Sequence, residues 1–281
     1  MVFQIQRVSE HGSGTAAVAR TALQGFPIVD EFSTPSDQKD ACKQVLMDLQ
    51  GHLVRCVAIS DRVRGEIAAA KQAVALHGLK TQSMGQVVEV PSVIDLQAQA
   101  ESFLEGARLA IADIARLIEP FYGGPANHKF HRLIDWSAKK FGHDDPLTQT
   151  ARDWRPWVER VVDMRNAVDH PKGGPEGRLW TKNFQLAVDS QTPKLIEPSW
   201  GLTDAPPVPI ASSMESIIEG AICLGECILV ALFEKLKSST IHALMEIPRN
   251  QRSPSNPLRF RLTLVGMPIP DGLPTPSEPS P

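Results

Sequence analysis

This 281-residue sequence has little of what marks several common protein classes. Its four cysteines are too few for the disulfide framework of a small secreted domain. The net charge of -3 argues against a protein that coats nucleic acid through bulk positive charge. A hydrophobic share of 42% excludes a chain that is disordered throughout. We therefore expect a folded globular protein whose partners must be inferred from local sequence.

Long hydrophobic runs are also missing. The longest apolar stretch, residues 220–233, is short for a membrane span and contains Glu226. The first residues, MVFQIQRV, contain one base and no apolar segment typical of a secretory leader. These features predict a cytoplasmic protein that does not associate with a membrane.

Motifs for cofactor and metal chemistry are equally scarce. There is no glycine-rich phosphate loop, no G-x-S-x-G elbow and no pair of C-x-x-C motifs. His128 and His131 lie three residues apart near the start of an expected helix, and His143, Asp144 and Asp145 follow its end, which leaves a hydrolytic metal site as an alternative. About 13 residues of helix separate the two groups by ~20 Å, too far for one ion. We predict no cofactor and no metal.

Apolar periodicity predicts a mainly α protein. Apolar residues recur at spacings of three and four over 35–78, which indicates a long amphipathic helix. A second stripe ends at Pro120, and the modest connection between the two helices favours an antiparallel pair. The same periodicity predicts further helices over about 127–141, 146–170 and 212–239. The last of these is apolar around much of its girth and is therefore expected to be central.

Short strands are expected around this bundle. Alternation over 184–188 and 194–196, with turn residues between, predicts a β-hairpin within an insertion at about 179–200. Alternation over 258–264 predicts an edge strand, and the proline-rich sequence from Pro268 predicts an extended or disordered tail. The expected organisation is an extended lead-in, a helical bundle with the hairpin insertion, and a strand with a tail, over 1–34, 35–247 and 248–281.

The fourth helix contains one anomaly. Its apolar stripe reaches Val161, continues at Arg165 and returns to an apolar residue at Val168. Burying an unpaired guanidinium is costly, so Arg165 must snorkel, pair with an acid, or face a partner, a cleft or an anionic ligand. The simplest of these alternatives is an ion pair with Asp163 or Asp169.

Polar residues surround Arg165 at the end of this helix. On a helical wheel Asn166, Asp169 and His170 fall on one side of the arginine. Asn166 and His170 are four residues apart, so the amide can orient the imidazole. A helix C-terminus also favours protonated histidine, a residue that titrates near neutrality.

The string MRNAVDHP at 164–171 resembles the signature of the HEPN superfamily, an arginine followed directly by a polar residue and then by histidine, late in a helical bundle. This resemblance implies an HEPN-like bundle that dimerises about the motif helices and, in many members, a metal-independent endoribonuclease of toxin-antitoxin or phage-defence systems. By position, Arg165 and His170 are the expected catalytic pair and Asn166 the orienting residue. We include Asp169 in the catalytic set because it lies on the same helix edge.

These residue types suit RNA cleavage without a metal. A base must take the proton of the 2′-hydroxyl, an acid must protonate the leaving 5′-oxygen, and cations must stabilise the charged phosphorane. A guanidinium binds two phosphate oxygens at once, and a two-fold homodimer through the motif helix would bring together two histidines. The expected products carry a 2′,3′-cyclic phosphate and a 5′-hydroxyl.

Charge patterning offers candidate RNA contacts. Residues 121–182 carry 11 bases and 8 acids, a net +3, while both flanking regions are negative. Within this region we predict phosphate contacts from Arg152, Arg155, Arg160 and Lys172. The expected partners are RNA, a second copy of the chain and an antitoxin protein. The alternative function is a catalytically silent HEPN-like module that binds protein or RNA.

Overall fold

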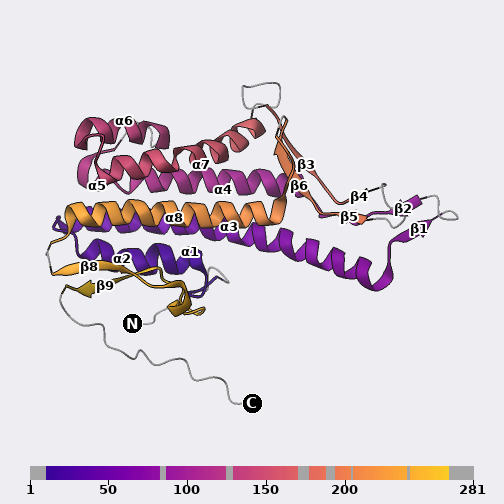
Figure 1. The fold of residues 1–281 in the computed structure, drawn as a ribbon, viewed down its shortest axis with the longest axis horizontal. Helices are drawn as coiled ribbons and strands as arrows, with labels where there is room; N and C mark the ends of the chain where they lie inside the picture. The colour runs from indigo at the N-terminus through magenta and orange to yellow at the C-terminus, as the bar shows by residue number, and fades with distance from the viewer. Residues whose placement is uncertain are drawn as a thin grey trace, which may run out of the picture.

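The computed structural model describes residues 11–82, 87–124, 129–169, 177–187, 194–203, 205–238 and 241–265. It is mainly helical, which confirms the predicted fold class at that level. Figure 1 shows three layers, with α4, α6 and α7 uppermost, α3 and α8 in the middle, and α1, α2 and a β-hairpin below. The principal helices are α3 (Ser36–His77), α4 (Leu96–Arg116), α6 (Phe130–Phe141), α7 (Pro146–Asp169) and α8 (Ile210–Leu236).

The two long helices α3 and α4 pack against each other in antiparallel directions, as predicted (Figure 1). The thiols of Cys42 and Cys56 donate to the carbonyl oxygens of Leu117 and Phe103, pairing the start of one helix with the end of the other. Both cysteines are buried, and burial raises the pKa of each thiol to about 12. The strands β1 (Lys80–Gln82) and β2 (Val87–Glu89) connect these helices as an antiparallel pair.

The helix α8 lies at the centre of the molecule, where it packs against α3, α4 and α7. It is long and apolar enough to cross a membrane, but 61% of its most apolar 18-residue segment is buried within the protein. It also contains Glu226, which is buried and paired with Arg20. These properties are those of a core helix and confirm its predicted central position.

The extended lead-in predicted over 1–34 is wrong for most of the described residues. The chain is helical from Ala16 to Asp30, as α1 (Ala16–Val18), the π-helical η1 (Ala19–Leu23) and α2 (Gln24–Asp30). Small residues permit close packing here: a Cβ atom at Gly25 would meet Leu46 Cδ1 at 2.7 Å. The alternating residues at 3–5 lie outside the described residues.

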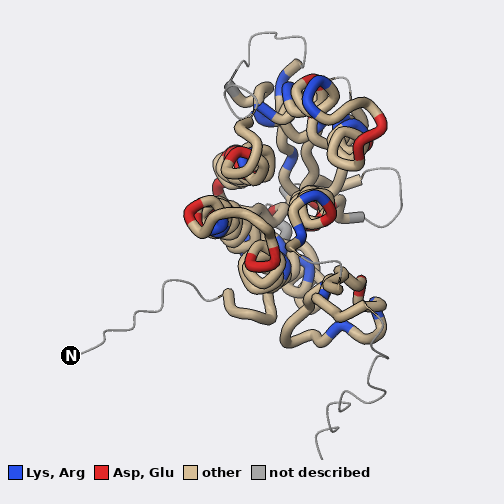
Figure 2. The backbone as a smooth tube through the Cα atoms, turned by 90° about the vertical axis from the view of Figure 1, so that its left-hand side faces the viewer, with Lys and Arg blue, Asp and Glu red and all other residues tan. Residues whose placement is uncertain are grey.

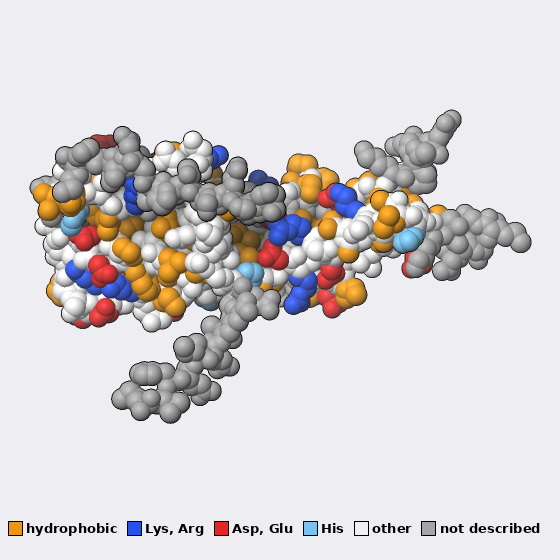
Figure 3. All heavy atoms as spheres, turned by 90° about the horizontal axis from the view of Figure 1, so that it is seen from below, with side chains coloured by type: hydrophobic (Ala, Val, Ile, Leu, Met, Phe, Trp, Pro, Cys, Tyr) orange, Lys and Arg blue, Asp and Glu red, His pale blue; other side chains and the backbone are white. Residues whose placement is uncertain are grey.

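Beyond the bundle, short strands form an arm. The predicted hairpin is confirmed as β4 (Gln185–Ala187) paired with β5 (Lys194–Ile196). A second sheet joins β3 (Leu179–Lys182), β6 (Ser199–Leu202) and β7 (Val208–Pro209). The end of α3 extends alongside these strands, so the molecule narrows from the bundle towards this end (Figures 1 and 3).

The predicted C-terminal strand is confirmed as β9 (Phe260–Leu264). The sequence predicts that the bundle continues to residue 247, and this boundary is wrong. The last bundle helix ends at Leu236, and β8 (His242–Glu246) is the antiparallel partner of β9. A short 3-10 helix, η3 (Arg249–Gln251), lies between the two strands. The proline-rich tail lies outside the described residues.

Candidate functional site

The buried face of α7 does not include Arg165, although the sequence predicted that residue as part of its apolar stripe. Val158 and Val161 are buried as predicted, but the next buried residues are Met164 and Ala167. Three successive steps of three residues rotate the stripe backwards, because each covers only 300° of the helix. Arg165 therefore lies at the edge of the core, with 24% of its side chain exposed. Its anomaly is resolved by partial exposure and pairing.

Arg165 forms an ion pair with an acid that the sequence did not indicate. Its Nε donates to Glu105 Oε2 of α4 at 2.7 Å, and Arg108 donates to both oxygens of the same carboxylate, with Nη2 2.6 Å from Oε1. The hydrogen bonds from Arg108 and, with smaller effect, Arg165 lower the pKa of Glu105 to about 2 against the opposing effect of burial. The result is a cluster of two guanidiniums around one carboxylate.

A pocket of about 640 Å³ lies beside this cluster, between α4, α6 and α7. Arg165 and Asn166 line one wall. Its charged lining comprises four bases and two acids, a net +2, from Arg108, Lys129, Arg155, Arg165, Glu159 and Asp163. The volume lies within the range of roughly 300–1,000 Å³ typical of small-ligand sites. This pocket is the candidate functional site.

Arg165 also borders a second pocket, of about 430 Å³, together with Arg55, Glu101 and Glu105. Arg165 thus lies on a ridge between the two pockets.

The remaining motif residues lie at the end of the described helix. Asn166 is half-buried and shares the large pocket with Arg165. Asp169 is the last residue of α7. The predicted catalytic His170 and the predicted phosphate contact Lys172 lie outside the described residues, so the meeting of Arg165 with His170 stays a prediction.

The structure separates the other predicted RNA contacts. Arg155 lines the large pocket and pairs with Glu159 at 2.6 Å. Arg152 is exposed and lies 3.3 Å from the side-chain oxygen of Gln149. Arg160 lines a different pocket from Arg155, so the described arginines do not all face one pocket. Figure 2 shows Lys and Arg intermixed with Asp and Glu on the upper helices.

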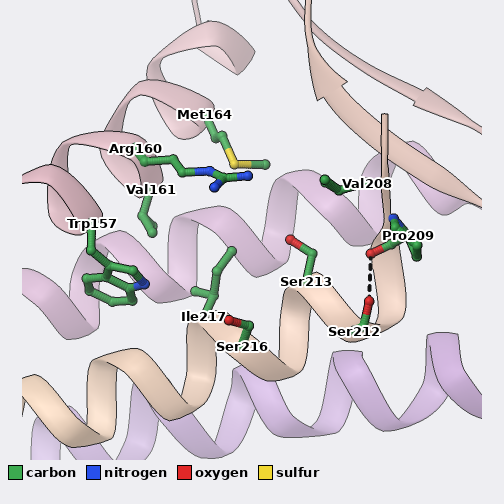
Figure 4. Close-up of a pocket in the computed structure, with 10 residues that line it drawn as sticks. All are labelled: Trp157, Arg160, Val161, Met164, Val208, Pro209, Ser212, Ser213, Ser216 and Ile217. Carbon is green, nitrogen blue, oxygen red and sulfur yellow. Dashed lines mark hydrogen bonds between the residues drawn. The ribbon is translucent and has the colours of Figure 1, made fainter. Parts of the chain in front are cut away.

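Arg160 lines a separate pocket of about 300 Å³ between α7 and the start of α8. Figure 4 shows its side chain reaching over the first turns of α8, near Ser213, with Trp157 at one end of the pocket. Arg160 forms no hydrogen bond or ion pair with any residue that the structure describes. This pocket is not continuous with the ridge at Arg165.

In the described part of the chain, no group of three or more His, Cys, Asp or Glu side chains has an arrangement that could hold a metal ion. Asp145 instead accepts the backbone N–H of Leu147 at 3.0 Å at the start of α7 and pairs with Lys235. His128 lies outside the described residues. His131 is exposed and lines the large pocket with Arg165.

Sequence reasoning missed four residues of the site, Glu105, Arg108, Lys129 and His131. The spacing of Glu105 and Arg108 indicates a helical i, i+3 pair, but nothing in it places that pair against α7. His131 was considered only as a metal ligand. Comparison with known proteins adds no identity: no family model, no curated protein and no solved structure matches this chain.

Proposed function

We propose that this protein is a metal-independent endoribonuclease of the HEPN type, which cleaves RNA through attack by the 2′-hydroxyl. The observation that carries the proposal is that Arg165 and Asn166 line one accessible pocket near the end of a bundle helix. In the sequence, Asn166 precedes the motif histidine by four residues. An arginine side chain buried within its own subunit would argue against the proposal, and Arg165 is 24% exposed.

In the proposed reaction Arg165 binds non-bridging oxygens of the scissile phosphate, and its planar fork stabilises the charge that develops there. His170 transfers a proton, and Asn166 orients its ring. Arg108 and Lys129 of the same pocket are suited to hold the phosphates on either side. The products carry a 2′,3′-cyclic phosphate and a 5′-hydroxyl.

The ion pair of Arg165 with Glu105 favours a second candidate function, the silent interaction module. The carboxylate of Glu105 accepts the hydrogen bond of Arg165 Nε, and with a pKa of about 2 it is ionised at every physiological pH. A substrate phosphate must therefore compete with an internal anion. In a silent module this ion pair would be permanent and Arg165 would serve only to join α4 to α7.

Cleavage of RNA in the presence of EDTA separates the two candidates. The endoribonuclease is expected to cleave single-stranded RNA, and Arg165→Ala and His170→Ala are each expected to abolish cleavage while thermal stability is retained. Wild-type protein that leaves a broad panel of RNAs intact would reject the enzyme and favour the module. Glu105→Gln is the matched variant, because it removes the negative charge beside Arg165 and leaves the arginine in place.

A toxin-antitoxin or phage-defence role and a homodimer through the motif helix belong to the same proposal. The dimer is expected to appear as twice the 30.7 kDa chain mass in light scattering at assay concentrations. An antitoxin is expected to relieve growth arrest on co-expression and to leave an Arg165→Ala strain unaffected.

A further inference from the structure

The large pocket contains a histidine that the HEPN-like motif does not include. His131 is the second residue of α6, and it lines the pocket together with Arg165 and Asn166 of α7. Phe130, its neighbour in the chain, is buried and fixes the first turn of α6 against the core. Because successive helical residues point about 100° apart, this anchor turns His131 away from the core.

The environment of His131 suits proton transfer. Its side chain is exposed, and it forms no hydrogen bond or ion pair with any residue in the described part of the chain. Arg108 and Lys129 line the same pocket, and their positive charge favours an anionic phosphate there. Histidine is the side chain that most often acts as a general acid or base in enzymes.

The proposed reaction needs two proton-transfer groups, whereas the motif supplies one histidine per chain. A homodimer could supply the second from another subunit. The pocket offers one within the same chain.

We propose that His131 is a second acid-base residue of the proposed active site, acting on a single-stranded RNA phosphodiester bound in the pocket that it shares with Arg165. This proposal rests on the proposed function. Single-stranded RNA is the substrate class because a pocket of about 640 Å³ accommodates roughly one nucleotide, and a strand can place a splayed nucleotide there.

The cleavage step is balanced in protons, because one group accepts a proton and another donates one. One histidine, neutral at the start, accepts the 2′-hydroxyl proton as the 2′-oxygen forms a bond to phosphorus. The other, protonated at the start, donates its proton to the 5′-oxygen as the phosphorus to 5′-oxygen bond breaks. The first histidine ends charged and the second neutral, and exchange with water restores both. The reaction requires no metal and no redox partner.

The test compares His131→Ala with His77→Ala, which removes an exposed histidine at the far end of α3. His131→Ala is expected to lower kcat/KM by about 10²–10⁴-fold and to remove one limb of the bell-shaped pH profile. His77→Ala is expected to match the wild type. Both variants are expected to bind RNA with methylated 2′-oxygens like the wild type, which separates loss of chemistry from loss of binding.

A substrate with sulfur in place of the leaving 5′-oxygen assigns the two roles. Its thiolate leaves without protonation, so the variant that lacks the acid is expected to regain activity and the variant that lacks the base is not. If His131→Ala keeps wild-type kcat/KM and both pH limbs while Arg165→Ala is inactive, this inference is overturned and the proposed function stands. If the wild type does not cleave RNA, both are overturned.

Discussion

Arg20 and Arg165 are both arginines within apolar helical patterns, but the protein treats them differently. Only 6% of the Arg20 side chain is exposed, and its Nε and Nη2 donate to both oxygens of the fully buried Glu226, at 2.9 and 2.6 Å. Arg165 is 24% exposed, and its acid, Glu105, is 38% exposed. The first ion pair lies inside the protein and the second borders two pockets.

The surroundings of Arg20 extend this contrast. Gln24 donates to Glu226 at 3.0 Å and accepts the backbone N–H groups of Arg259 and Phe260, each at 2.7 Å. Burial alone would lower the pKa of Arg20, but hydrogen bonding and attraction to Glu226 raise it above its ordinary value. This network joins the N-terminal helices, α8 and the C-terminal hairpin. Its polar groups are satisfied by one another, as a structural role requires.

The largest expected effect is on stability at the buried pair. Arg20→Met removes the cation and leaves the buried carboxylate of Glu226 poorly compensated, which is expected to cost about 3–5 kcal/mol of unfolding free energy. Urea unfolding measures this. Glu219→Gln, which alters the half-exposed acid that also binds Arg20, is the control and is expected to cost less than about 1 kcal/mol. Equal losses in the two variants would contradict the distinction.

Arg165→Ala is expected to show the reverse pattern. Because its ion pair is partly exposed, its loss is expected to change stability by less than about 1 kcal/mol. Cleavage is expected to fall by at least about 100-fold, since one transition-state donor is removed. Arg165→Lys is expected to recover little, because an ammonium lacks the planar fork. A stability loss as large as that of Arg20→Met would make Arg165 a second structural arginine.

Acid titration sharpens the comparison at Glu105. Its pKa is lowered on folding from an ordinary value near 4.5 to about 2, so its ionised form stabilises the folded state. That stabilisation is complete above about pH 4.5 and is lost as the pH falls towards 2. Glu105→Gln is expected to be less stable than the wild type at neutral pH, with the difference vanishing near pH 2. Unfolding curves that stay separated at low pH would contradict this.

The smallest expected effect concerns two arginines of α7 that line different pockets. Arg155→Ala is expected to weaken binding of 2′-O-methylated single-stranded RNA and to reduce the slope of log K against log salt by about 0.7, the value for one phosphate contact. Arg160→Ala is expected to leave both unchanged, because its side chain lines the separate pocket next to α8. Equal effects would indicate that RNA wraps around the helix.

The sequence predicted the long helices better than it predicted the N-terminal helices or the contacts of the candidate site. The helices α3, α6, α7 and α8 were predicted closely because their apolar spacing and their glycine and proline ends are local signals. The N-terminal helices were missed, although the alanines at 16, 17, 19 and 22 favour helix, because their pattern is interrupted by glycine and proline.

The sequence by itself determined the long helices of the bundle, the central position of α8, and the order of Arg165, Asn166 and His170 along the motif. Only the tertiary structure decided that Glu105 pairs with Arg165, that Arg20 and Glu226 share a buried network, and that His131 lines the large pocket. Helix periodicity is set by neighbours three and four residues apart. The pairs that define the site and the network are separated by 60 and 206 residues, and only helix packing brings them together.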